Sequence, residues 1–320
     1  MKLATGNIDG THCVLTETAD GGIASLGAGD IAPTMRSIIN YTASERRALA
    51  SVIADGHHTT PVDPADIEWL PPVTDPSKIV GVALNNDVFN YLAARKMTAP
   101  MYFLTPPSAM TGHGTHIEVD PAWGLVHPEP ELAAVIGATL KRATPEDAAA
   151  AVFGYTIIND ISSPGLKSDD SVELVMPEGM TVDEPWRTMR GDDDRSLYLT
   201  YHARSKGTDT FAPIGPWIVT ADEITRPNDL TVRGYLDDDL VLEDSTANLT
   251  FSIPDVIAHL SQTMTLTPGD IVHFGTAARP ALPDRFPTIR SIDLTRHGHR
   301  VSVEISGLGR LENPIRRLST

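Results

Sequence analysis

Cysteine is almost absent from this chain of 320 residues, in which Cys13 stands alone. A single thiol excludes an intrachain disulfide, so a reducing compartment is expected. Long apolar runs are missing as well. No run reaches the length of a membrane span, and the chain does not open with a basic segment followed by an apolar one, as a secretion signal would. The sequence therefore predicts a cytoplasmic protein with no membrane partner.

Positive charge is also scarce, because 25 lysines and arginines face 42 acidic residues, a formal net charge of −17. This balance argues against binding to nucleic acid. It does not exclude an anionic substrate, since a bound cation reverses the local field. No glycine-rich phosphate loop and no Ser-His-Asp order can be argued from the sequence. The contents of hydrophobic residues, 41%, and of charged residues, 21%, are typical of a globular protein.

From about residue 73 onwards, strand patterns alternate with turns that contain proline and glycine, and helices are few. This composition favours a mixed β-roll or sandwich over a doubly wound sheet. Residues 1–72 are interpreted as a small N-terminal α/β domain, with short strands and a helix that begins at Thr42. We therefore predict a strand-rich α+β fold in which 1–72 form the small domain and 73–320 the larger one.

The stretch 127–137 contains two glutamates, Glu129 and Glu131, and continues as an apolar run typical of a strand. Because side chains alternate along a strand, these carboxylates point the same way and repel each other unless a cation lies between them or one is protonated. Asp160 ends the next predicted strand, 154–160, which a short helix brings back towards the glutamates. Three such oxygen ligands suit Mg²⁺, Mn²⁺ or Ca²⁺. A solvated strand edge with Asp160 as a helix cap fits the same spacing, which leaves both interpretations open.

Four segments resemble the fumarylacetoacetate hydrolase family in order and spacing. They are ELAAVIG at 131–137, FGYTIINDIS at 153–162, DTFAPIGPWIVTADEI at 209–224 and LTPGDIVHFGT at 266–276. The resemblance covers roughly Pro76 to Pro314. It implies a β-rich catalytic domain after a smaller N-terminal domain, a homodimer, and a small 2-oxo acid as substrate. It also favours the metal site over the solvated strand edge.

The resemblance assigns roles to single residues. It implies a metal-binding set of Glu129, Glu131 and Asp160. Around this set it implies a catalytic Lys206 and the substrate-binding residues Asp209, Thr276 and Tyr102. The ion that it implies is Mg²⁺, with Mn²⁺ and Ca²⁺ as alternatives.

The most consequential departure from the family lies in its mobile lid segment. Phe89 stands where the family has a histidine, and Leu92 where it has a glutamate; in the family this pair activates water. Neither Phe nor Leu can take up a proton. We therefore expect another base: His113, His116 or a residue of the insertion that follows Lys167.

That insertion is a second departure. After Asp160 the family usually continues SARDLQ, whereas this chain has Pro164 and Gly165 in place of the arginine and the aspartate. The segment 168–197 is longer than the family pattern and carries the acidic run Asp192–Asp194. We interpret it as an inserted surface loop that either forms a rim over the site or has no role there.

These patterns predict a divalent-metal-dependent enzyme that hydrolyses a carbon–carbon bond in a 2-oxo acid of the acylpyruvate type. The ion would chelate the 2-oxo and carboxylate oxygens and stabilise an enolate. Dehydration, hydration or decarboxylation of a keto-deoxy sugar acid is the close alternative, because dehydration and decarboxylation need no nucleophilic water. A catalytically silent homologue that binds a metal and a ligand is the second alternative, which Phe89 and Leu92 support.

Overall fold

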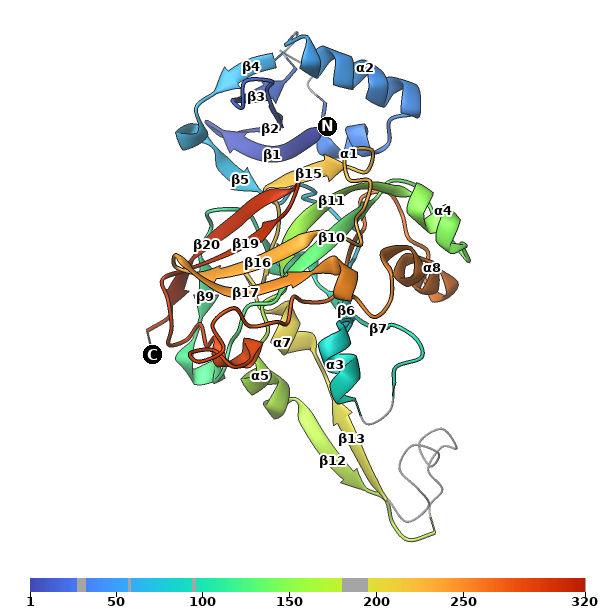
Figure 1. The fold of residues 1–320 in the computed structure, drawn as a ribbon, viewed down its shortest axis with the longest axis vertical. Helices are drawn as coiled ribbons and strands as arrows, with labels where there is room; N and C mark the ends of the chain where they lie inside the picture. The colour runs from blue at the N-terminus through green and yellow to red at the C-terminus, as the bar shows by residue number, and fades with distance from the viewer. Residues whose placement is uncertain (28–32, 57–58, 94–95, 180–194, 320) are drawn as a thin grey trace.

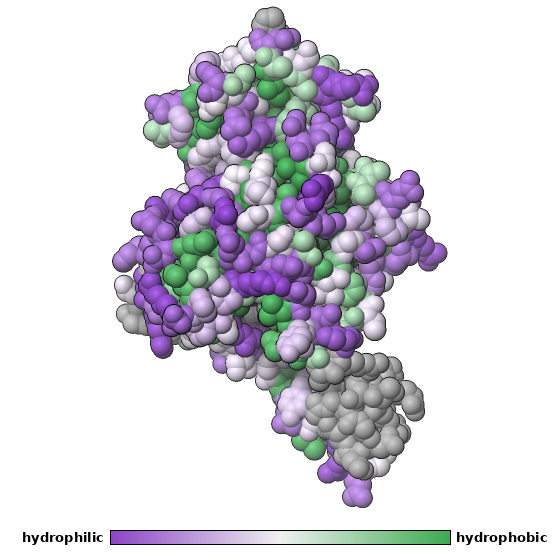
Figure 2. All heavy atoms as spheres, in the orientation of Figure 1, coloured by the Kyte–Doolittle hydropathy of each residue, from purple (hydrophilic) through white to green (hydrophobic). Residues whose placement is uncertain are grey.

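The computed structural model describes residues 1–27, 33–56, 59–93, 96–179 and 195–319. Figure 1 shows a strand-rich body with the N-terminal segment above it and a narrow two-stranded arm below it. Hydrophilic residues cover much of the face seen in Figure 2. Within the described ranges, no helix is both long and apolar enough to span a membrane. The predicted strand-rich α+β fold is confirmed.

Eleven strands of the described chain form one large sheet, in the order β4-β3-β2-β1-β15-β11-β10-β18-β6-β7, with β5 also paired to β1. Their bounds are β1 (Lys2–Ile8), β2 (Thr11–Glu17), β3 (Ile23–Leu26), β4 (Thr59–Val62), β5 (Glu68–Leu70), β6 (Ile79–Ala83), β7 (Met101–Thr105), β10 (Pro130–Ile136), β11 (Val152–Asn159), β15 (Trp217–Thr220) and β18 (Ile271–His273). Strands β10 and β11 lie in its middle, and every residue of both is buried. The predicted return of Asp160 is confirmed, because β11 runs antiparallel to β10 and pairs Asn159 with Pro130.

A second sheet packs against the middle of the first. Its order is β17-β16-β19-β20-β9, with β17 (Asp239–Ser245), β16 (Thr231–Leu236), β19 (Arg300–Ile305), β20 (Gly309–Arg317) and β9 (Ile117–Val119). Leu132 and Ile157 of the large sheet share one apolar cluster with Val303 and Leu311 of the second. Alternate residues of β10, such as Ala133, belong to another cluster on the opposite face. The middle of the large sheet is therefore packed on both faces, which fixes the ends of β10 and β11, where the acidic residues stand.

The N-terminal segment contains α1 (Met35–Ile39) and α2 (Ala43–Ala54) as well as β1 to β5. The predicted helix start is confirmed, since Thr42 caps α2 in a capping box with Glu45. Strand β1 is hydrogen-bonded to β15, and Leu3 packs in one cluster with Ala133. The segment thus continues the large sheet. A domain boundary at residue 72 stays a prediction.

Short helices and strands flank the two sheets. They are α3 (Asp87–Leu92), α4 (Pro145–Ala150), α5 (Pro164–Asp169), α7 (Ala203–Gly207), α8 (Ile253–Thr263), the parallel pair β8 (Met110–Thr111) and β14 (Ala212–Pro213), and the 3-10 helix η5 (Ile289–Ser291). The arm is the hairpin of β12 (Ser171–Val175) and β13 (Ser196–Thr200), which begins in the predicted insertion 168–197 and ends three residues beyond it. The acidic run Asp192–Asp194 lies outside the described residues.

Candidate metal centre and active site

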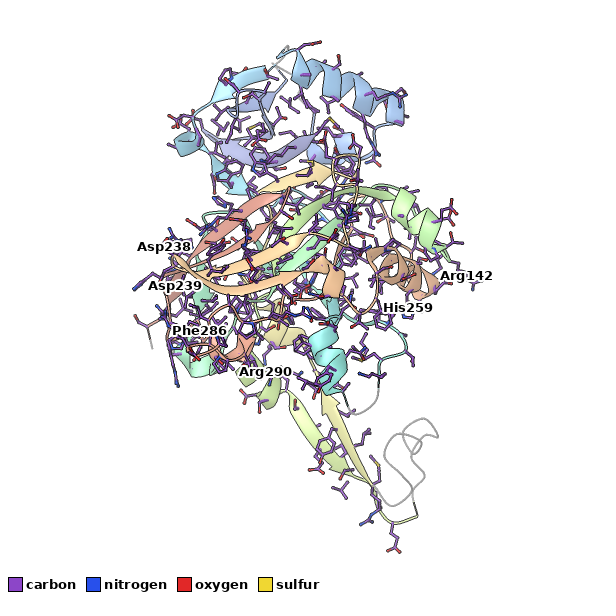
Figure 3. All side chains as sticks on the ribbon, in the orientation of Figure 1. Arg142, Asp238, Asp239, His259, Phe286 and Arg290 are labelled. Carbon is purple, nitrogen blue, oxygen red and sulfur yellow. The ribbon has the colours of Figure 1, made fainter. Side chains whose placement is uncertain are left out.

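A cavity of about 310 Å³ opens where β6, β7, β10 and β11 meet α3, α5 and α7. Three acidic residues line it, Glu129, Glu131 and Asp160. Two lysines and one arginine also line it, Lys167, Lys206 and Arg290. Figure 3 labels Arg290, which belongs to η5 and lies at the lower end of the body. The cavity thus combines buried carboxylates with fixed positive charge.

Glu131, on β10, is held by the neighbouring strand β18. Its Oε2 lies 2.7 Å from His273 Nδ1 and accepts a hydrogen bond of 2.8 Å from the Gly275 backbone amide. The register that pairs Ala133 with His273 brings the two side chains together. Both residues are at least 98% buried, so the position of this carboxylate is fixed.

Asp160 and Glu129 share Lys206. The lysine Nζ donates to Asp160 Oδ2 and, over 2.8 Å, to Glu129 Oε2. Ser162 Oγ donates to the other Glu129 oxygen over 2.8 Å. The backbone holds the pair in place as well, because the Asp160 amide donates to the Glu129 carbonyl.

Burial and neighbouring charges shift the pKa values of this group. Burial raises the pKa of Asp160 to about 7, although the Lys206 charge opposes the shift. Burial would also raise the pKa of Glu129, but the charges of Lys206 and His127 outweigh it and hold that pKa below its ordinary value. For His273 the charges of Glu131 and Asp160 outweigh burial and raise its pKa. Negative charge is therefore in excess here, and a further cation would relieve it.

The residues present fit a divalent metal ion. Ligand atoms of Glu131, Asp160 and His273 all lie within 4.8 Å of one another. Asp160 Oδ1 is buried and has no hydrogen-bond partner within the described residues. The carboxylate oxygens of Glu131 and Asp160 suit Mg²⁺ or Mn²⁺, whereas an imidazole nitrogen suits ions such as Fe²⁺ and Zn²⁺ better.

This cluster differs in one member from the set that the sequence predicts. His273 stands beside Glu131 and Asp160, whereas both oxygens of Glu129 are engaged by Lys206 and Ser162. His273 was not predicted, although a histidine inside the apolar run that precedes Gly275 was a visible signal. A role for Glu129 as a direct ligand stays a prediction.

The other predicted residues divide into two groups. Lys206, Thr276 and Tyr102 line the cavity. Asp209, His113 and His116 do not line it. The structure does not bring these last three to the cavity wall, and their roles at the site stay predictions.

The physical reason lies in the loop that carries both histidines. His113 Nδ1 accepts a hydrogen bond of 3.1 Å from the Glu312 amide on β20, and its ring packs edge-on against Trp69. His116 is exposed, as is Asp209. The loop thus turns towards β20, and neither histidine is positioned as the missing base.

His202 is a candidate base that the sequence did not reveal. It precedes α7, lines the cavity and stacks on Phe103, with ring centroids 6.2 Å apart. Burial lowers the pKa of His202, and the charges of Lys167 and Lys206 lower it further. Its imidazole is accordingly neutral at pH 7 and able to accept a proton.

The departures from the family pattern have structural counterparts. Phe89 lines the cavity, whereas Leu92 is 71% exposed and does not. A side chain at Gly165 would place its Cβ 1.9 Å from the Trp123 carbonyl oxygen, so only glycine fits at this point of α5.

Residues 78–316 match the family of the fumarylacetoacetate (FAA) hydrolase C-terminal domain. A bifunctional isomerase/decarboxylase of 4-hydroxyphenylacetate degradation from Salmonella dublin is 31% identical over 76% of this chain and 48% of its own length. The human mitochondrial oxaloacetate tautomerase FAHD2B is 28% identical over 98% of this chain and 90% of its own.

Among solved structures, maleylpyruvate hydrolase from Sphingobium sp. SYK-6, in complex with manganese(II) and pyruvate, is 26% identical, with a TM-score of 0.68 over the full length of both chains. These three relatives are named for different reactions on small organic acids. The motifs, the fold and the sequence match agree, and the chain belongs to the fumarylacetoacetate hydrolase family of enzymes.

Proposed function

We propose that this protein is a divalent-metal-dependent enzyme that hydrolyses a carbon–carbon bond in a small 2-oxo acid of the acylpyruvate type. The observation that carries the proposal is the buried Asp160 Oδ1, which has no hydrogen-bond partner among the described residues and lies beside Glu131 and His273 at a cavity with cationic side chains. The Sphingobium relative, which was solved with manganese and pyruvate, supports Mn²⁺ as the ion and a 2-oxo acid as the ligand, and Mg²⁺ is the alternative ion.

Glu131, Asp160 and His273 would hold the ion. When bound, the ion supplies Lewis acidity to the carboxylate and 2-oxo oxygens of a substrate. Lys206 is fixed by Glu129 and Asp160, so its ammonium presents a positive charge at a constant place in the cavity. Thr276 lines the same cavity and would contact the substrate carboxylate.

Hydrolysis also requires a group that takes a proton from water. His202 meets the two requirements that the structure can test, since it lines the cavity and its lowered pKa leaves it neutral. Phe89 stands in the family's histidine position and cannot take up a proton, so it cannot be this base. We therefore assign His202 as the base of the proposed hydrolysis.

The test is product analysis in ¹⁸O-labelled water with acylpyruvates and either Mn²⁺ or Mg²⁺. Hydrolysis puts label into a newly formed carboxylate and releases pyruvate, and His202→Gln should reduce the rate about 100-fold or more, which is typical of the loss of a general base. His116→Gln, at an exposed position outside the cavity, is the matched control and should leave the rate unchanged. A product without label would refute the hydrolase assignment.

A second candidate function is tautomerisation, decarboxylation or dehydration of a 2-oxo acid. The apolar Phe89 in the cavity favours it, because these reactions need no activated water. The names of the human tautomerase and the Salmonella isomerase/decarboxylase support the same class of reaction. An unlabelled product with an intact carbon chain or released CO₂ would identify this class. Tight Mn²⁺ and pyruvate binding without turnover of any substrate would identify a silent homologue.

A further inference from the structure

Two lysines line the active-site cavity, and they differ in how their side chains are held. The Nζ of Lys206, on α7, donates to Glu129 over 2.8 Å and to Asp160. The side chain of Lys167, on α5, has neither a hydrogen bond nor a carboxylate partner within the described residues. In a protein with 42 acidic and 25 basic residues, an unpaired lysine at a cavity requires an explanation.

The helix that carries Lys167 is fixed to the body of the protein. Leu166 is buried, and Gly165 lies so close to Trp123 that a Cβ there would be 1.9 Å from the carbonyl oxygen. The Lys167 amide donates to the Ser163 carbonyl over 3.0 Å. The side chain of Lys167 therefore reaches the cavity wall from a backbone that is held in place.

The surroundings of Lys167 favour the free amine, whereas those of Lys206 favour the ammonium ion. Burial lowers the pKa of Lys167, and the charges of Arg290 and Lys206 lower it further. The Glu129 charge opposes this shift without reversing it. Burial would also lower the pKa of Lys206, but the charges of Asp160 and Glu129 outweigh it and raise that pKa. Of the two lysines, Lys167 is thus the one whose nitrogen can act as a nucleophile.

The chemistry of such an amine matches the class of ligand proposed for the cavity. A lysine that is partly desolvated and lies beside other cations attacks carbonyl carbon atoms. A 2-oxo acid offers such a carbonyl next to its carboxylate. Phe89, Met101 and Phe103 line the same cavity, and apolar walls limit the water that would reverse the reaction. The SARDLQ pattern that the family usually shows has a glutamine at the position of Lys167, and an amide cannot react in this way.

We propose that Lys167 is a nucleophilic amine that forms a covalent iminium with the carbonyl carbon of a 2-oxo acid. The lysine nitrogen bonds to this carbon as the carbonyl double bond opens onto its oxygen. That oxygen takes up two protons, one from the lysine nitrogen and one from solvent, and leaves as water. The carbon–nitrogen double bond that remains carries one positive charge. The inference rests on the proposed function for the class of ligand alone, since no step of it involves a metal ion.

The iminium gives the protein a further activity, the exchange of hydrogen on the carbon next to the carbonyl. Its positive charge acidifies the C–H bonds of that carbon. His202, a neutral imidazole at the same cavity, removes one of these protons, and the electron pair of the bond forms the carbon–carbon double bond of a neutral enamine. Reversal of this step returns a hydrogen from solvent. Exchange on pyruvate should therefore proceed without a divalent ion.

The first test is reductive trapping with sodium cyanoborohydride on the full chain in EDTA, with pyruvate as the probe. We expect peptide mapping by mass spectrometry to find a 1-carboxyethyl group on Lys167. This residue should be labelled about tenfold or more faster than Lys141, an exposed lysine outside the cavity, because binding holds the carbonyl beside the amine. Lactate, which has a hydroxyl in place of the carbonyl, should give no label.

The second test separates the amine from its charge. Lys167→Arg keeps the positive charge but cannot form an iminium. This variant should lose the label, and its rate of deuterium exchange into the methyl group of pyruvate, followed by NMR in EDTA, should fall about tenfold or more. Lys141→Arg makes the same change outside the cavity and should keep the exchange rate. Thermal unfolding checks that each variant is folded.

The inference fails if Lys167 and Lys141 are labelled at the same rate, or if exchange is unchanged in Lys167→Arg. Calorimetry of pyruvate binding to the Mn²⁺-loaded protein tests the proposed function separately. Pyruvate binding to the loaded protein without label on Lys167 would refute the inference and leave the proposed function standing. Label on Lys167 in a protein that binds no divalent ion would do the reverse.

Discussion

Removal of the buried carboxylate of Asp244, on β17, should be among the most destabilising changes near the site. The carboxylate accepts hydrogen bonds from the backbone amides of Ser245 and Ala278 and from the side chains of Asn86, Asn248 and Arg279. Asn86 caps α3 and donates to the carbonyl of Thr276 over 3.1 Å. One carboxylate thus connects the helix that carries Phe89 with the segment that carries Thr276.

Asp244→Ala should lower the free energy of unfolding by about 3 kcal/mol. Removal of one partner from a buried ion pair costs about 3–5 kcal/mol. The lower end applies here because the Arg279 side chain is 37% exposed and keeps Asp87 as a partner. Asp239→Ala is the control, since its ion pair with Arg285 is exposed on both sides and should be worth less than about 1 kcal/mol.

The pH dependence of this difference has a defined sign. Burial alone would raise the pKa of Asp244, but its hydrogen bonds, led by that of the Ala278 amide, outweigh burial and lower it. A folded pKa below the unfolded value of about 3.9 means that the ionised carboxylate stabilises the fold above that pH. The contribution is lost as the pH falls through the folded pKa. The cost of Asp244→Asn should therefore be constant between about pH 5 and 7 and smaller at pH 3.

Urea unfolding followed by tryptophan fluorescence measures both quantities. Equal costs for Asp244→Ala and Asp239→Ala at pH 7 would refute the buried network as the cause. If the cost of Asp244→Asn stays constant down to pH 3, the charge of Asp244 is not the cause of the stability difference. A neutral asparagine and a protonated aspartate would then differ in stability for another reason.

Three further predictions concern the metal, the assembly and α5. Glu131→Ala should abolish Mn²⁺ and Mg²⁺ binding in calorimetry, and unchanged affinity would remove Glu131 from the metal site. Light scattering at micromolar concentration should give a mass about twice 34.5 kDa, as for a homodimer, and a mass of 34.5 kDa alone would contradict this. Gly165→Ala should lower the free energy of unfolding in urea by about 1–3 kcal/mol, because its Cβ would overlap the Trp123 carbonyl. The control Ser168→Ala, exposed on the same helix, should lower it by less than about 0.5 kcal/mol. Equal costs would exclude that overlap.

Local patterns in the sequence predicted much of the fold and part of the site. Strand alternation predicted that Glu129 and Glu131 face one way, and both line the cavity. Asp160 could be placed because one short helix, begun by the capping residue Thr144, connects two adjacent strands. Such patterns depend on neighbours in the chain, which a single sequence displays directly.

The missed residues depend on contacts between distant segments. His273 reaches Glu131 through the pairing of β18 with β10, and no local pattern gives that register. His113 stands closer in the chain to Phe89 than His202 or His273 does. The hydrogen bond from the Glu312 amide, however, turns its loop away from the cavity. Sequence proximity thus pointed to histidines that do not line the cavity, because it does not indicate the direction in which a loop packs.

The overall negative charge of the protein and its proposed anionic substrate are compatible because the relevant charges are local. At physiological ionic strength, charges that lie further away than about 8 Å are largely screened. Counted over the whole cavity wall, three carboxylates face two lysines and one arginine, although negative charge is in excess at the acidic cluster itself. A divalent ion bound by Glu131, Asp160 and His273 would then make the cavity positive. The surface acids therefore set the net charge of −17, while the cavity alone determines which ligand is attracted.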